Sequence, residues 1–253
     1  MITSQEFLAS LSPMAQKLMT IYQFKESKPL RLTITDNEDK PCFMVFDNPD
    51  CYPVYINPEA LGKKAEMYFI HQFCHCVQMD SDFPYVKEKD RNDTEAAQLA
   101  MALNSLVLDR YVHSIFKSNG YPLDIDALDK RYTELYCRIR YWNENNTDLK
   151  TLDKKYLEYI YATQIASIYF DLDTKKARGL QKLAAPVSKE IKQYAGMCIS
   201  IIKSYAYNTN IGCHYIFEKL VEDLKLSDIL YVEHQELFPD DKSENPSLTN
   251  TNE

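Results

Sequence analysis

Two hydrophobic patterns follow one another along the chain. Ser12 before Pro13 is typical of a helix start, with serine as the N-cap and proline in the first turn, and predicts a helix through about residue 22. Short β-rich runs separated by Asp, Asn and Pro turn signals come next. They cover residues 30–35, 42–46 and 52–56. We expect one small sheet from these runs and no other β structure.

From Pro58 onward the apolar residues recur with the helical period of 3.6. One helix is predicted over residues 59–79. A second begins where Asp93 and its neighbours can cap it and ends at Gly120, which after Asn119 is typical of a left-handed C-cap. Further helices are predicted over residues 125–142, 152–170, 187–207 and 211–226, with a short one near Leu230.

The expected fold class is therefore α+β and mainly helical, with a small N-terminal β-sheet packed on a helix pair and a helical C-terminal half. We predict an α+β region over residues 1–120 and a helical region over residues 121–238 that packs on it as one domain. Residues 239–253 are polar and contain proline, so a disordered tail is expected there.

Composition narrows the classes of function. The chain has 253 residues, of which 45% are hydrophobic, and its net charge of -8 predicts no attraction to nucleic acid or to an anionic membrane. No apolar run reaches the ~18 residues of a membrane-spanning helix, and the start lacks a secretory pattern. Seven cysteines without framework spacing are typical of reduced thiols. A soluble cytoplasmic protein is expected, with a peptide or protein as its partner.

One group of residues could carry chemistry. In IHQFCHCVQ, His71 and His75 are four residues apart within a predicted helix. This spacing puts both imidazoles on one face, about 40° apart, as a metal ion bound by two ligands from one helix requires. Glu95 follows near the start of the next helix and can complete a His2Glu site with a position open for water. Zinc is the expected metal.

At these residues the chain resembles the glutamate-ligand branch of the zincin metallopeptidases. Their pattern is His-Glu-x-x-His on one helix, with a glutamate ligand on a second helix about twenty residues later. The resemblance covers about a third of the chain and implies a short sheet, a histidine helix and a glutamate helix, with His71, His75 and Glu95 as metal ligands.

The sequence departs from this pattern at Gln72, which stands where the family has its general-base glutamate. An amide has no basic lone pair at neutral pH, and general acid–base assistance is worth about 10² to 10⁴ in rate. We therefore expect a zincin-like protein that is a catalytically impaired or inactive metallopeptidase homologue, and that keeps a metal or a peptide-binding cleft. An extended peptide would add to the edge of the strand at residues 52–56.

Three alternatives for the site stay open. Asp109 lies on the same predicted helix as Glu95, about 21 Å further along, so only one of the two carboxylates can reach the histidines. Cys74 shares the face of His71, whereas Cys76 points away, and small core residues are the expected role of both. Either His214 or His234 could stabilise an oxyanion, although no spacing indicates this.

Two other functions compete with the zincin-like hypothesis. In the first, residues 122–236 form a helical interaction or scaffold surface, and the histidine pair is purely structural. In the second, the chain is an active metal-dependent peptidase that uses a base other than Gln72. Metal content separates the first from the zincin-like hypothesis, and peptide hydrolysis separates the second.

Overall fold

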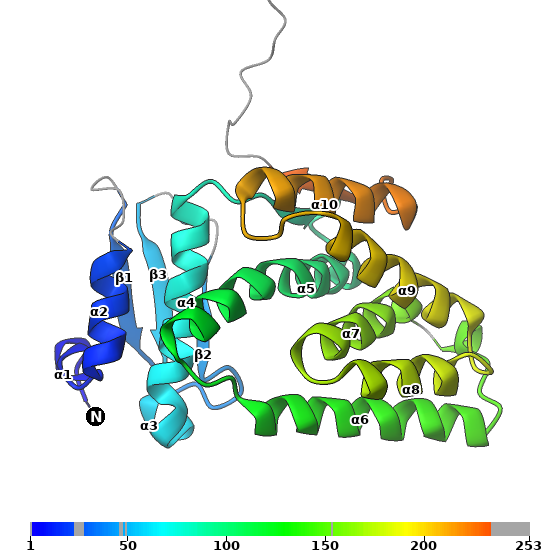
Figure 1. The fold of residues 1–253 in the computed structure, drawn as a ribbon, viewed down its shortest axis with the longest axis horizontal. Coiled ribbons are helices and arrows are strands. Elements are labelled where there is room, and N and C mark those ends of the chain that lie inside the picture. Colours follow the sequence, from blue (N-terminus) through cyan, green and yellow to red (C-terminus); the bar gives the residue numbers. More distant parts are fainter. Residues whose placement is uncertain (1, 23–27, 46–47, 49, 153, 234–253) are drawn as a thin grey trace, which may run out of the picture.

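The computed structural model describes residues 2–22, 28–45, 48, 50–152 and 154–233 (Figure 1). Within these residues the fold is α+β and mainly helical, as the sequence predicts. The first half contains α1 (Ser4–Ala9), α2 (Pro13–Ile21), β1 (Leu30–Ile34), β2 (Cys42–Met44), β3 (Tyr52–Ile56), α3 (Pro58–Leu61), α4 (Ala65–Asp80), β4 (Tyr85–Glu88) and α5 (Thr94–Asn119).

Helices dominate the second half of the described chain. A hydrophobic cluster joins four of them, because Ile139, Ile165, Leu180 and Ile191 are all fully buried within it. The elements are α6 (Ile125–Glu144), α7 (Leu157–Asp171), α8 (Thr174–Ala184), α9 (Lys189–Ser204), α10 (Asn210–Asp223) and β5 (Leu230–Glu233), with short 3-10 turns at Gly62–Lys64 and Leu149–Thr151.

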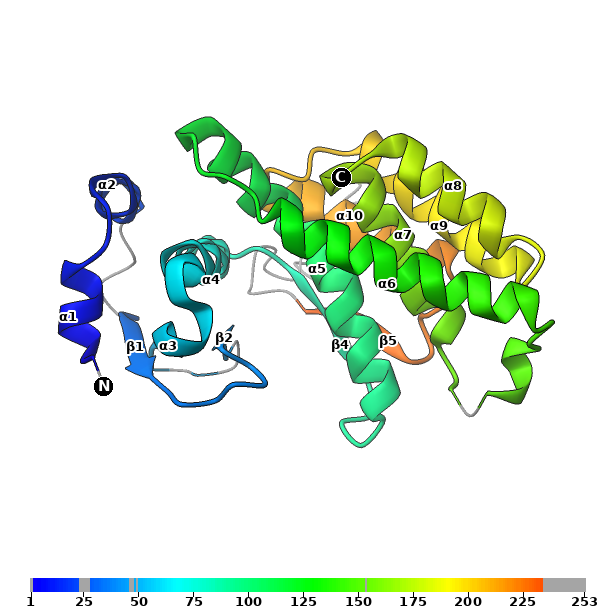
Figure 2. The ribbon, with the colours of Figure 1, turned by 90° about the horizontal axis from the view of Figure 1, so that it is seen from below.

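The N-terminal sheet has the strand order β1-β3-β2, with β1 parallel and β2 antiparallel to the central strand β3. Helices α2 and α4 both lie on one face of this sheet (Figures 1 and 2). The expectation that residues 52–56 offer an open edge is wrong, because β3 is paired on both sides. Of the two outer strands, β2 is the one that lies beside the site described below.

A larger hydrophobic cluster includes residues on both sides of residue 120. Phe73 of α4, Leu103 of α5, Cys198 of α9 and Phe217 of α10 all belong to it. In addition, β5 pairs antiparallel with β4, although about 145 residues separate the two strands. The N-terminal and C-terminal regions are thus connected both by side-chain packing and by backbone hydrogen bonds.

Local end signals place several helices correctly. Ser12 caps α2 with proline in its first turn, Asp93 caps α5, and Gly120 ends α5 in the left-handed conformation. The predicted helix over residues 59–79 is instead divided at Gly62, whose φ of 54° and ψ of -129° do not fit a helix. Glycine tolerates this conformation because it has no Cβ.

Other predictions for the described residues are wrong. The segment near Leu230 is strand β5 and not a helix, so a second, two-stranded sheet exists. Helices α1 and α8 were not predicted. Residue 46, His234 and the tail at residues 239–253 lie outside the described residues, as does the end of the region predicted to run to residue 238.

Candidate metal centre

The histidine pair lies on α4, a helix with most of its residues buried against the sheet and the neighbouring helices. His75 is buried at 7% exposure, and His71, one turn earlier, is half-buried. The predicted spacing holds, because the two Nε2 atoms are 3.1 Å apart. Both imidazoles therefore point toward the same place, as two ligands of one ion must.

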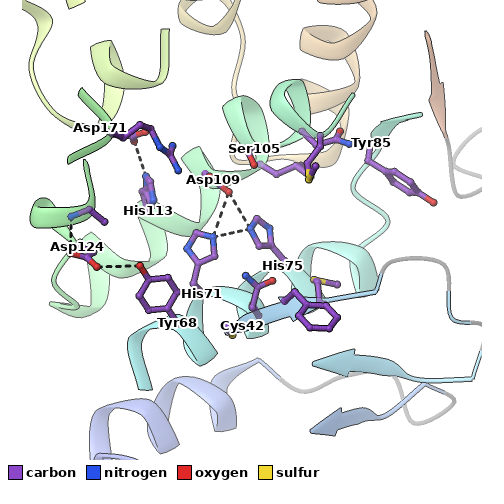
Figure 3. A pocket seen from close by; sticks show the side chains of 18 of the residues that line it. Cys42, Tyr68, His71, His75, Tyr85, Ser105, Asp109, His113, Asp124 and Asp171 are labelled. Carbon is purple, nitrogen blue, oxygen red and sulfur yellow. Dashed lines mark hydrogen bonds and ion pairs between the residues drawn. The ribbon is translucent and has the colours of Figure 1, made fainter. Parts of the chain in front are cut away.

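The third member of the group is Asp109, from α5 (Figure 3). Its Oδ1 lies 3.1 Å from Nε2 of His75 and 3.6 Å from Nε2 of His71. Ligand atoms of all three residues lie within 4.8 Å of one another, and the group could hold a metal ion.

Gln78 determines which nitrogen of His75 carries a proton. Its Nε2 donates to the carbonyl of Leu108 at 3.0 Å, which turns its Oε1 toward Nδ1 of His75 at 2.7 Å. An amide oxygen only accepts, so Nδ1 of His75 is the protonated nitrogen. In the neutral ring Nε2 then has a lone pair that faces the carboxylate of Asp109. A metal ion between the two would bind this lone pair and balance the negative charge of the carboxylate.

The spacing of the three atoms suits a transition metal. They form a triangle with sides of 3.1, 3.6 and 3.1 Å. The point equidistant from its corners is about 1.9 Å from each, which is close to the bonds of about 2.0 to 2.2 Å that zinc makes to such atoms. Ligand atoms around a tetrahedral ion with such bonds are about 3.4 Å apart. The side chains thus need little rearrangement to bind one.

Two pKa values describe the electrostatics of the group. Burial, with a smaller contribution from His75 and His113, lowers the pKa of His71 below its usual value, and the neighbouring Asp109 offsets this only in part. Burial raises the pKa of Asp109, but the hydrogen-bonding and charge interactions with His71 and His75 together outweigh it and hold this pKa well below the usual value. Asp109 is therefore ionised and favours cation binding.

The structure does not bring Glu95 to the histidine pair. Glu95 lies in the first turn of α5, where its carboxylate accepts a hydrogen bond from the backbone N–H of Lys155 at 2.8 Å. Asp109 lies at the place beside the histidines where the sequence analysis expects Glu95. The middle of α5, and not its start, crosses α4 at the histidines.

A cavity of about 670 Å³ opens over the three residues. Strand β2 contributes Cys42, Phe43 and Met44 to its wall, and Gln72 lines it next to the histidines. Further apolar lining comes from Met67, Ala100, Met101, Leu108, Phe116, Leu123 and Leu128. The candidate metal centre is thus accessible to a ligand larger than water.

The cysteines near the pair are core residues, as the sequence predicts. Cys74 and Cys76 have no exposed surface. Burial raises the pKa of the Cys74 thiol to about 12 and also raises that of Cys76, so both stay protonated. His214 lies on α10 and is not among the residues that line the cavity, whereas His234 is outside the described chain.

Four residues of the site were missed by the sequence reasoning. Gln78 follows His75 by three residues on the same helix, a spacing that could have indicated a second hydrogen-bonding group. His113 follows Asp109 by one turn, and it binds Asp171, which in turn pairs with Arg110. No local signal could reveal Asp171, because 58 residues separate it from His113.

Comparison with known proteins leaves the family open, since no protein-family model, curated protein or solved structure matches this chain. Among the described residues, no helix combines the length and the apolar composition needed to cross a bilayer. The inference of function therefore depends on the site itself.

Proposed function

We propose that this protein binds one zinc ion through His71, His75 and Asp109 and holds an extended peptide in the cavity above it. The observation that carries the proposal is the convergence of two imidazole nitrogens and one carboxylate oxygen at 3.1 to 3.6 Å. Gln78 adds support, because a metal-binding histidine usually donates its other N–H to an acceptor.

Zinc is the metal that this donor set suits best in a four-coordinate site. Two histidines and one carboxylate leave one position for water or for a substrate oxygen. Bound there, zinc would polarise that oxygen and lower the pKa of a bound water. Ferrous iron also accepts two histidines and a carboxylate, so the metal analysis below includes it.

Gln72 limits the chemistry that such a site performs. Its amide lines the cavity beside the histidines and cannot take a proton from a metal-bound water. We therefore expect peptide hydrolysis to be slow or absent. A zincin-like origin is supported by the order of the elements, in which a short sheet precedes a helix with two histidines and a helix with a carboxylate.

Strand β2 supplies the proposed contact with a peptide. At the two ends of β2 the backbone hydrogen bonds run toward β3. The N–H of Val45 donates to the carbonyl of Pro53, and the carbonyl of Pro41 accepts from the N–H of Asn57. Because backbone groups alternate in direction along an antiparallel strand, those of Cys42 and Met44 point away from β3, to a side where no strand of the described residues pairs with β2. That side borders the cavity, and an extended peptide can add there as a further strand.

Metal content tests the first half of the proposal. Protein freed of metal with a chelator, then incubated with zinc or ferrous iron and desalted, should retain one zinc ion per chain by mass spectrometry. The Asp109→Ala variant should retain none, whereas the matched Glu95→Ala variant on the same helix should bind as the wild type does. Retention by Asp109→Ala and loss in Glu95→Ala would contradict the assignment. A wild-type protein that retains no metal would contradict the proposal and favour the alternative in which the histidine pair is purely structural.

Peptide binding tests the second half. Zinc-loaded protein is screened against random linear peptides, and the best binder is measured with two variants of Cys42. Cys42→Pro removes an N–H that does not serve β3 and should weaken binding about tenfold, the effect of one or two hydrogen bonds. Cys42→Val keeps that N–H and should bind normally. Equal affinity of the two variants would exclude strand addition at β2.

A further inference from the structure

A second polar group lies beside the candidate metal centre. Nδ1 of His113 lies 2.8 Å from Oδ1 of Asp171, the last residue of α7, and Arg110 forms a salt bridge to the same carboxylate. The side chains of Arg110 and Asp171 are 5% and 4% exposed. Helix α5 thus supplies both the guanidinium and the imidazole that contact this one carboxylate of α7.

This contact fixes the orientation of the His113 ring. An ionised carboxylate only accepts hydrogen bonds, so Nδ1 of His113 carries the proton in the contact with Asp171. In the neutral ring Nε2 is then an acceptor, on the side of the ring away from Asp171. Figure 3 shows the ring between Asp171 and His71.

The ring lies close to the three proposed ligands but is not one of them. His113 is one helical turn beyond Asp109, and its ring centroid is 6.0 Å from that of His71. The group whose ligand atoms lie within 4.8 Å of one another, as found in the described residues, does not include it. A metal–oxygen bond of about 2.0 Å and a hydrogen bond of about 2.8 Å together span roughly 4 Å at a tetrahedral angle. A ligand atom on the metal would thus reach a ring nitrogen about 4 Å from the ion, and His113 is the further histidine that lines the cavity beside the three proposed ligands.

We infer that His113, oriented by Asp171, accepts a hydrogen bond from the ligand in the open position of the metal. This inference rests on the proposed metal site and adds a preference among its ligands. The preferred class carries an oxygen donor for the metal and an O–H or N–H for His113, as water and hydroxamates do. An anion without hydrogen gains nothing from the same contact.

Arg110 makes the contact rigid. Its guanidinium lies over the ring of Phe170 at 5.6 Å and pairs with Asp171, so the carboxylate cannot turn away from His113. A hydrogen-bond acceptor that is already oriented loses little conformational entropy when a ligand binds. Asp171 is accordingly a positioning residue that acts through His113, and His113 contacts the bound ligand and not the metal.

Two small probes test the inference on the full chain loaded with cobalt, whose visible spectrum reports exogenous ligands. Acetohydroxamate can donate to His113, and azide cannot. In His113→Phe, which keeps a ring but no nitrogen, hydroxamate affinity should fall about tenfold and azide affinity should change less than about twofold. His214→Phe, on α10 and not among the cavity-lining residues, is the matched control and should leave both affinities unchanged.

Each outcome has a separate meaning. Equal changes for the two probes, or none for either, would overturn the hydrogen bond to His113. Loss of metal from His113→Phe would make His113 a ligand and also overturn it, whereas a metal-free wild type would overturn the proposed function itself. A second measurement needs no variant, since the ¹⁵N resonance of Nε2 of His113 in the zinc-loaded protein should shift with hydroxamate and stay in place with azide.

Discussion

Replacing Gln78 by methionine removes the group that orients His75. Gln78 is fully buried, accepts from Nδ1 of His75 at 2.7 Å and donates to the carbonyl of Leu108 at 3.0 Å. Methionine has a similar length and no hydrogen-bonding amide, so the change deletes two contacts with little change in volume. The ring of His75 then loses its preference for the tautomer that presents Nε2 to a metal.

The expected effect on affinity follows from that loss. Removing such an orienting partner typically weakens metal binding about 10- to 100-fold, or about 1.4 to 2.7 kcal/mol. Metal-free protein should also lose roughly 1 to 3 kcal/mol of unfolding free energy, because Nδ1 of His75 is left buried without its acceptor. Competition with a chromogenic chelator measures the first quantity, and urea unfolding measures the second.

The control is the same substitution six residues earlier. Gln72→Met changes a residue that lines the cavity and contributes no ligand, so zinc affinity should stay within about threefold of the wild type. Unchanged affinity in Gln78→Met would refute the role of the tautomer. Complete loss of binding in both variants would also refute it, since neither glutamine is proposed as a ligand.

Three further predictions concern catalysis, acid stability and the fold. Gln72→Glu supplies a base, so chelator-sensitive peptide hydrolysis should rise about 10² to 10⁴-fold over the wild type; no rise in zinc-loaded protein would count against a zincin-like site. Burial raises the pKa of Asp171, but the contacts with His113 and Arg110 lower it by more, so the folded pKa lies below the unfolded value of about 3.9. The ionised carboxylate therefore stabilises the fold above about pH 3.9, and this stabilisation is lost as the pH falls through the folded pKa. Asp171→Asn should therefore lose less unfolding free energy than the wild type across that acid range, and parallel pH curves would contradict this. Gly62→Ala should cost about 1 to 3 kcal/mol in urea unfolding because of the positive φ, despite open space around the added Cβ, and a neutral effect would contradict the strain.

The sequence predicted those parts of the fold that depend on neighbouring residues. Ser12, Asp93 and Gly120 act through their own helix ends, so their caps could be placed from local pattern. The strand at Leu230 was missed because a run of four residues carries no clear period, and its partner β4 lies far away in the chain. The break at Gly62 between α3 and α4 could not be predicted from the local pattern either, because the helical periodicity continues on both sides of it.

The candidate site was predictable to the level of one helix. His71 and His75 converge because four residues make about one turn of α4. The choice between Glu95 and Asp109 could not be made in the same way, since fourteen residues of helix bring both carboxylates to within about 40° of the same face. Which of them meets the histidines depends on the height at which α5 crosses α4, and tertiary packing determines that height.

The central claim is that two imidazoles and the carboxylate of Asp109 bind one metal ion. Anomalous diffraction at the zinc absorption edge, from crystals of zinc-loaded protein, tests it most directly. We predict one strong peak about 2.0 to 2.2 Å from Nε2 of His71, Nε2 of His75 and a carboxylate oxygen of Asp109. A peak bound to Glu95, or no peak at the histidine pair, would contradict the claim.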